Sequence, residues 1–202
     1  LKSTGSFYLH CDPTMSHYLK IVCDMIFGHK NYKNEIIWLR STDTGSSKSI
    51  SKKFPSNSDT ILYYTKSKNY TFNPVMQEYS AEYLARFKYF DEQGAYRWQC
   101  LKTYSEKRYD ELNSQGRIRW GVKARYSDYK QYIWELRGNL IANIWTDINQ
   151  LNPASNERLG YPTQKPLSLM ERIVAASSNP GDIVADFFCG CGTTIAAAEK
   201  LG

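Results

Sequence analysis

The sequence lacks any apolar run that approaches the roughly 20 residues of a membrane-spanning helix. It also lacks a basic segment followed by an apolar leader, so nothing in it indicates secretion. Its five cysteines are an odd number without a disulfide-like framework, which favours a reducing compartment. These absences predict a cytoplasmic protein without a membrane partner.

The sequence is not poor in aromatic residues, as disordered chains typically are. The 202 residues are 42% hydrophobic and 14% aromatic. This is enough apolar material to bury the interior of one good-sized domain, or of a core with an insert. The first residue is Leu1 rather than Met, so we expect the sequence to be part of a longer chain.

The net charge of +6 is concentrated in the middle of the sequence. Residues 30–75 carry a surplus of five positive charges and residues 76–145 a surplus of three, whereas residues 146–202 are net negative. Within residues 97–130, nine basic residues are interleaved with tyrosine and tryptophan. This composition suits a phosphate backbone and unstacked bases, and a solvated, tyrosine-rich surface explains it equally well.

Apolar periodicity predicts strands over residues 6–10, 34–38 and 59–64. After the first strand we expect a helix that ends at Gly28. The apolar stripe of this helix contains Tyr18, Leu19, Val22, Met25 and Ile26. Residues 41–58 have no apolar periodicity, and loops of such length are often functional.

The last 40 residues have the most regular pattern. It predicts a helix over residues 166–176, a strand over 183–188, a glycine turn over 189–192 and a helix over 193–198. Helix, strand, glycine turn and helix in this order are typical of a parallel α/β unit.

The glycine turn is a candidate ligand site. Gly190 and Gly192 allow a sharp turn, and Asp186 ends the preceding strand at the edge where open α/β sheets bind ligands. A carboxylate there favours an amine or a ribose over a bare phosphate. The sequence has no phosphate-binding GxxxxGK[ST] motif, and Ile195 occupies the third glycine position of a dinucleotide site. A glycine pair alone can also form a turn that has only a structural role and binds no ligand.

Two motifs together carry a family resemblance. Residues 186–194, DFFCGCGTT, resemble the S-adenosylmethionine motif of amino-methylating DNA methyltransferases, and residues 161–166, YPTQKP, resemble its companion. Residues 5–12, 34–38 and 59–66 are similar to further segments of that family. The order of the motifs resembles the permuted β class, which makes N6-methyladenine or N4-methylcytosine.

The resemblance implies S-adenosylmethionine as cofactor and assigns roles to particular residues. Asp186 would face the methionine amino group and Phe188 would pack against the cofactor. Thr163 and Lys165 would hold the methionine carboxylate. Two roles are equally open for Asp12: it lines the cofactor pocket, or it caps a helix. Phe187 departs from the family, which usually has proline there. The cofactor-binding candidates are Asp12, Thr163, Lys165, Asp186, Phe188, Cys189, Gly190, Gly192 and Thr193.

The expected fold is an incomplete Rossmann-like methyltransferase sheet with an inserted target-recognition region. We expect a catalytic-half segment over residues 1–69, a DNA-recognition insert over 70–155 and a cofactor-binding segment over 156–202. The expected partners are double-stranded DNA and a cognate restriction endonuclease. The DNA-binding candidates are Lys48, Lys52, Lys53, Arg117, Arg119, Lys123 and Arg125.

The sequence has no Pro-Pro dipeptide, although the family holds its flipped target base with a Pro-Pro-aromatic motif. In the permuted order this motif would precede Leu1, so the catalytic residues are unknown and we expect the 202 residues alone to be inactive and poorly stable. Adenine N6 is the favoured target, and cytosine N4 is the runner-up.

Other classes of protein remain as alternatives. One is a DNA-binding remnant of a methyltransferase that has no catalysis, and another is a nicotinamide-nucleotide enzyme. A metal site is disfavoured, because Cys189 and Cys191 are two positions apart in a tight turn, and His10 and Cys11 are strand neighbours that point to opposite faces.

Overall fold

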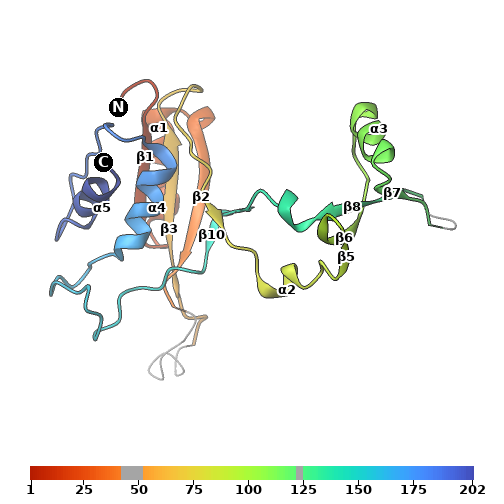
Figure 1. Cartoon of the computed structure of the whole chain (residues 1–202). Coiled ribbons are helices and arrows are strands. Elements are labelled where there is room, and N and C mark those ends of the chain that lie inside the picture. Colours follow the sequence, from red (N-terminus) through yellow and green to blue (C-terminus); the bar gives the residue numbers. More distant parts are fainter. Residues whose placement is uncertain (42–51, 122–124) are drawn as a thin grey trace. The chain divides into compact units, whose positions relative to one another are not determined.

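A computed structural model describes residues 1–41, 52–121 and 125–202 of the chain (Figure 1). The chain divides into two compact units. Unit 1 contains Leu1–Val75 and Leu140–Gly202, and unit 2 contains Met76–Asn139. Unit 2 therefore lies inside the range 70–155 in which the sequence analysis expects an insert.

Unit 1 is built on a four-stranded sheet with the order β1-β3-β2-β10. The strands are β1 (Ser6–Cys11), β2 (Tyr32–Leu39), β3 (Ser58–Thr65) and β10 (Ile144–Trp145). β3 runs antiparallel to β1 and β2, and β10 runs parallel to β2. The carboxyl ends of β1 and β2 therefore lie beside the start of β3, where Thr60 is opposite both Cys11 and Ile37. We call this end of the sheet the carboxyl edge.

Helices cover both faces of this sheet, because its residues alternate between two apolar clusters. On one face, Ile61 and Tyr63 of β3 pack with Leu169 of helix α4 (Leu167–Ser177). On the other face, Leu62 and Tyr64 pack with helix α1 (Ser16–Phe27). Helix α5 (Thr193–Leu201) lies beside α4, and Lys200 pairs with Glu171 at 2.6 Å. Unit 1 is thus a three-layer α/β arrangement.

Most of the predicted elements of unit 1 are confirmed. The three strands near the start, the helix that ends at Gly28 and both C-terminal helices form where the sequence pattern predicts them. Gly28 has a positive φ of 84°, and a 3₁₀ turn, η1 (His29–Asn31), follows it. The predicted buried stripe of α1 is wrong in detail. Leu19, Cys23 and Phe27 face the sheet, whereas the side chains of Tyr18, Val22, Met25 and Ile26 are exposed.

The predicted strand over residues 183–188 is also wrong. These residues have no regular secondary structure, and Ile183, Phe187 and Phe188 are exposed. An extended segment becomes a strand only when another strand pairs with its backbone. None of the described sheet residues pairs with this segment. The described sheet of unit 1 is also largely antiparallel, not parallel as the pattern suggested.

Unit 2 contains a second four-stranded sheet, with the order β5-β6-β8-β7 and antiparallel pairing. Its apolar core is small and includes Phe87, Leu101, Leu112 and Tyr132. The elements are β4 (Met76–Gln77), α2 (Ala81–Leu84), β5 (Tyr89–Asp91), β6 (Gly94–Cys100), α3 (Glu106–Ser114), β7 (Ile118–Arg119), β8 (Asp128–Tyr132), η3 (Ile133–Glu135) and β9 (Asn139–Leu140).

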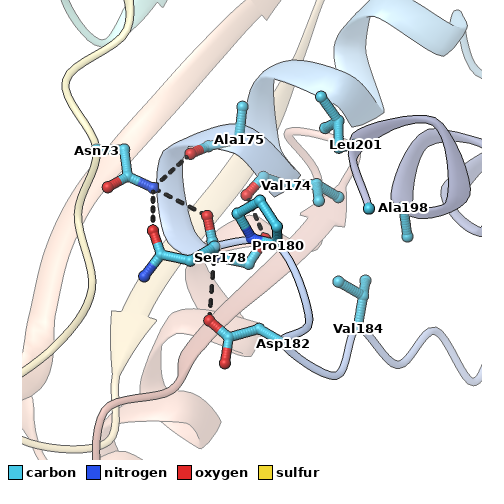
Figure 2. A pocket seen from close by; sticks show the side chains of 11 residues that line it. Asn73, Val174, Ala175, Ser178, Pro180, Asp182, Val184, Ala198 and Leu201 are labelled. Atoms are coloured by element: carbon cyan, nitrogen blue, oxygen red, sulfur yellow. Dashed lines mark hydrogen bonds between the residues drawn. The ribbon is translucent and has the colours of Figure 1, made fainter.

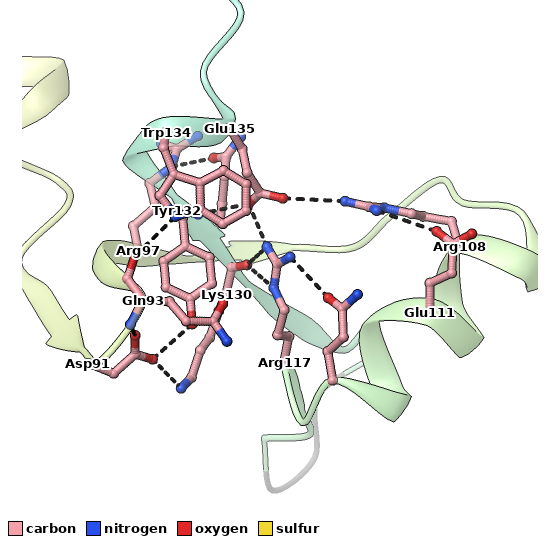
Figure 3. A network of polar contacts seen from close by, with 12 residues as sticks. Asp91, Gln93, Arg97, Arg108, Glu111, Arg117, Lys130, Tyr132, Trp134 and Glu135 are labelled. Carbon is pink, nitrogen blue, oxygen red and sulfur yellow. Dashed lines mark hydrogen bonds and ion pairs between the residues drawn. The ribbon is translucent and has the colours of Figure 1, made fainter.

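A polar network supplements this small core (Figure 3). Glu135 accepts hydrogen bonds from Arg117 at 2.5 Å and from the backbone N–H of Tyr132 at 2.8 Å, and it lies 3.5 Å from Arg108. At the other end of the network, Asp91 accepts from Lys130 at 2.7 Å and from the hydroxyl of Tyr132 at 2.9 Å. The bonds of Asp91 join β5 to β8, and those of Glu135 join η3 to the residue before β7 and to α3, so the network connects the elements around the sheet of unit 2.

Candidate functional site

The glycine turn is organised around one carboxylate. Asp186 Oδ1 accepts a hydrogen bond from the backbone N–H of Phe188 at 2.9 Å, and Oδ2 accepts from Thr194 Oγ1 at 2.6 Å. Thr194 belongs to the first turn of α5, so the carboxylate connects the start of the turn to the helix that follows it. Each carboxylate oxygen can accept more than one hydrogen bond, and Asp186 is exposed. It can therefore bind a cationic donor as well.

The two glycines of the turn have different surroundings. Gly190 has a φ of +57°, and a Cβ built on it would lie 2.9 Å from Cε1 of Tyr161. Gly192 has a φ of +86° and precedes the first residue of α5, and a Cβ there would meet nothing within 4 Å. Only Gly190 therefore brings its backbone against another segment, and that segment is the start of the YPTQKP motif. The structure thus brings the two sequence motifs together.

Apolar side chains surround the turn without covering it. Phe187 and Phe188 are 90% and 93% exposed. Cys189 accepts a backbone hydrogen bond from Gly192 at 2.8 Å, and the hydroxyl of Thr193 lies 3.4 Å from Cys191 Sγ. A carboxylate, a helix N-terminus and open aromatic rings within one turn suit a ligand that has both a cationic and an apolar part.

Lys165 of the companion motif is half-buried. Its ammonium donates to the backbone oxygen of Thr163 at 3.2 Å. Burial lowers the pKa of Lys165, with the carboxylate of Asp59 raising it and the guanidinium of Arg40 lowering it. A half-buried cation with one backbone partner is suited to an anionic group.

The sequence analysis missed a charged cluster at the carboxyl edge. Asp59, at the start of β3, is only 7% exposed. Its carboxylate lies 2.9 Å from His10 Nε2 at the end of β1 and 3.2 Å from Arg40 Nε just after β2. The signal was a single acidic residue at the start of an apolar strand, and its two partners depend on strand register. We name these residues the edge cluster.

The side chain of Asp12 is bonded within the turn that precedes α1. Its Oδ1 accepts from the backbone N–H of Thr14 at 2.8 Å and of Met15 at 3.1 Å, and from the hydroxyl of Thr14. These bonds, first of all those from Thr14, lower the pKa of Asp12. The turn that leads into α1 is therefore held by Asp12, which supports the capping alternative.

The DNA-binding candidates have several different environments. Arg117 is 5% exposed and its guanidinium is bound to Glu135 and to the backbone oxygen of Lys130, so the expected phosphate contact of Arg117 is withdrawn. Arg119 pairs with Asp128 at 3.1 Å and stacks over Trp98 at 3.9 Å. The candidates Lys52, Lys53 and Arg125 are exposed to solvent. Lys48 and Lys123 lie outside the described residues.

Unit 1 also has a hollow of about 260 Å³ between the ends of α4 and α5 (Figure 2). The side-chain amide of Asn73 donates there to the carbonyl oxygens of Ala175 and Ser178 at 3.0 and 2.9 Å. Asn73 thus satisfies the free carbonyls at the end of α4, a structural role. None of the cofactor-binding candidates lines this hollow.

The described part of the chain contains neither a candidate metal site nor a membrane-spanning helix. No group of three or more His, Cys, Asp or Glu side chains there is placed to hold a metal ion. Among the same residues, no helix is both long and apolar enough to cross a membrane.

The chain matches the DNA methylase family N6_N4_Mtase over residues 1–202. It is 30% identical to the Type II methyltransferase M.EcaI of Enterobacter cloacae, covering 100% of this chain and 49% of that protein. It is 31% identical to the Type II methyltransferase M1.MboII of Moraxella bovis, and this match covers 85% of this chain and 55% of that protein. It is 29% identical to the DNA adenine methyltransferase YhdJ of Escherichia coli K12, and this match covers 100% of this chain and 55% of that protein. The chain thus spans about half the length of these curated relatives.

Among solved structures, the chain is similar to M1.HpyAVI in its crystallised complex with SAM, with a TM-score of 0.51 and 17% identity. The similarity covers 100% of this chain and 66% of that one. At this identity the likeness shows a shared fold. It confirms the predicted class, a mixed α/β fold with an incomplete Rossmann-like sheet.

Proposed function

The chain belongs to the N6/N4 DNA methylase family, and from this premise we propose that its protein methylates an exocyclic amine in duplex DNA. The methyl donor is S-adenosylmethionine, and the favoured target is the N6 amine of adenine. The N4 amine of cytosine is the second candidate.

The contact between Gly190 and Tyr161 carries this proposal. The glycine turn and the YPTQKP motif are about 30 residues apart in sequence, and each alone has a structural explanation. Their meeting at Gly190, where a Cβ would press on the ring of Tyr161, supports one shared ligand site, because close approach is what a glycine permits.

The residues present fit the proposed cofactor. The exposed carboxylate of Asp186 would accept hydrogen bonds from its amino group, and the open ring of Phe188 would pack on its apolar part. The open space at Gly192 leaves the N-terminus of α5 accessible. Lys165 and Thr163 would hold its carboxylate. When bound, the cofactor supplies an electrophilic methyl group on a sulfonium. The chain positions this group, since amine methylation needs alignment and no covalent enzyme intermediate.

The substrate and partner follow from the relatives and from the charge of the chain. Two relatives are named Type II methyltransferases and a third is named a DNA adenine methyltransferase. The net charge of +6 suits duplex DNA. We extend the proposal to a restriction-modification role with a cognate endonuclease as partner, and we propose that unit 2 reads the DNA.

Calorimetric titration of the full-length protein tests the cofactor assignment. We expect binding of S-adenosylmethionine and none of NAD, and we expect Asp186→Ala to weaken the binding at least tenfold, because a charge-assisted hydrogen bond is lost. Asp182→Ala is the matched control, since Asp182 is a nearby exposed carboxylate that pairs with Lys2 at 3.7 Å and accepts from the backbone N–H of Asn179 at 3.0 Å. Unchanged affinity in Asp186→Ala would refute the assignment. DNA binding without cofactor binding would support a non-catalytic remnant instead.

Nucleoside analysis tests the target base. DNA from cells that express the full-length protein is digested and its methylated nucleosides are separated by mass. We expect N6-methyldeoxyadenosine. Exclusive formation of N4-methyldeoxycytidine would select the second candidate.

A further inference from the structure

Phe54 is the most exposed of the large apolar side chains in the described part of the chain. It is 99% exposed, more than Phe188 at 93%. Single exposed apolar residues are common on proteins. The position of Phe54 beside the carboxyl edge of the sheet is what makes it informative.

Arg40 attaches the segment next to Phe54 to this edge. Its backbone N–H donates to the carbonyl oxygen of Asn57 at 2.8 Å, and Nη2 donates to that of Ser56 at 3.0 Å. Arg40 is in turn held by Asp59 of the edge cluster. Phe54 lies two residues before Ser56, so its backbone is within about 7 Å of the attached point.

The proline after Phe54 restricts its backbone, and the residues before it in the sequence are basic. Pro55 has a fixed φ, and a residue before proline is restricted to extended conformations. Lys52 and Lys53 precede Phe54 and are exposed, and residues 52–58 contain no acidic residue. An exposed phenyl ring on a stiff backbone next to cations is complementary to stacked bases within an anionic backbone.

We propose that Phe54 inserts into the base stack of duplex DNA and fills the gap left when the target base rotates out. This inference rests on the proposed function, because only an enzyme that acts on an extruded base creates such a gap. The carboxyl edge is the place where open α/β sheets bind their ligands. A side chain attached to that edge is therefore next to the position that an extruded base occupies.

Removal of a base from the DNA tests this without knowledge of the recognition sequence. A duplex with one central abasic site already contains the gap, so insertion of a side chain into it requires no unstacking. We expect the full-length protein to bind the abasic duplex about tenfold more tightly than the intact duplex. In Phe54→Ala the preference should fall below about twofold, and Phe54→Leu, which keeps an apolar wedge, should retain most of it.

Two further variants distinguish the insertion of Phe54 from general changes in DNA binding. Met25→Ala removes another apolar side chain that is 83% exposed, in the last turn of α1 and away from the carboxyl edge, and should keep the full preference. The double variant Lys52→Ala/Lys53→Ala should weaken binding to both duplexes by the same factor, because phosphates are present in both. A 2-aminopurine beside the abasic site should report the stacking of Phe54 by a loss of emission that Phe54→Ala lacks.

The outcomes distinguish this inference from the proposed function. A preference for the abasic duplex that survives Phe54→Ala, or no preference in the unaltered chain that still binds DNA, overturns the wedge and leaves the methyltransferase proposal intact. Absence of binding to either duplex overturns both.

Discussion

The imidazole of His10 and the carboxylate of Asp59 meet between neighbouring strands, with Nε2 2.9 Å from Oδ2. The other oxygen of Asp59 lies 3.2 Å from Nε of Arg40. One carboxylate thus connects β1, β3 and the residue after β2 at the carboxyl edge. Since Asp59 is largely buried, the edge cluster contributes to stability as well as to the shape of the proposed site.

We expect Asp59→Ala to lower the free energy of unfolding by about 2 kcal/mol, because it leaves the Arg40 charge without its partner in a half-buried place. Denaturant unfolding followed by tryptophan fluorescence measures the change. In Asp182→Ala an exposed pair and one exposed turn hydrogen bond are lost instead, so its effect should be about 1 kcal/mol or less. Equal effects of the two substitutions would show that the edge cluster has no special stabilising role.

Gly190→Ala should weaken cofactor binding more than Gly192→Ala. Both substitutions force alanine into a left-handed conformation, but only the Cβ at position 190 meets the Tyr161 ring, at 2.9 Å. The ring of Tyr161 must shift, which alters the packing of the YPTQKP motif against the turn. Calorimetry with S-adenosylmethionine should show a loss of about tenfold or more beyond that of Gly192→Ala. If the two variants bind equally, the contact is not part of the cofactor site.

Salt dependence tests the lysines beside Phe54. If Lys52 and Lys53 each neutralise one DNA phosphate, the double alanine variant should reduce the slope of log affinity against log salt by about 1.8. Measurements between 50 and 200 mM salt, about the range over which such slopes are read, give this number directly. An unchanged slope would mean that these lysines are solvated surface residues.

Arg117→Met should destabilise the chain and leave the salt slope unchanged. The substitution leaves the largely buried charge of Glu135 with the more distant Arg108 and the backbone N–H of Tyr132, and a loss of about 2–3 kcal/mol is expected. Arg119→Met is the matched control, because Arg119 and Asp128 form an exposed pair worth less than about 1 kcal/mol. A reduced salt slope in Arg117→Met would restore the DNA contact first assigned to Arg117.

Acid should weaken unit 2 through Asp91. The hydrogen bond from Lys130, with that from Tyr132, holds the pKa of Asp91 below its usual value. A lowered carboxyl pKa contributes stability above the unfolded value of about 3.9, and this contribution is lost as the pH falls through the lower folded value. Unfolding midpoints should therefore fall less steeply with pH below about 4 in Asp91→Asn than in the unaltered chain. Parallel curves would contradict this assignment.

Local patterns in the sequence determined many elements of unit 1 and the two motifs. Strands β1, β2 and β3 and helices α4 and α5 form where the pattern predicts them, because alternation and helical spacing act between near neighbours. The glycine turn was recognised because its function requires particular residues at fixed spacing. These features depend on a few consecutive residues, so a sequence is enough to find them.

Contacts between distant residues were decided by the tertiary structure alone. The partners of Asp59 depend on the register of β3 against two other strands, and the burial of Arg117 depends on Glu135, 18 residues away. The face of α1 that is buried depends on where β3 lies. Residues 183–188 have the apolar pattern of a strand, but a strand also requires a neighbour to pair with its backbone. A sequence shows what each segment can do locally, whereas pairing and burial are decided by the partners that the fold brings to it.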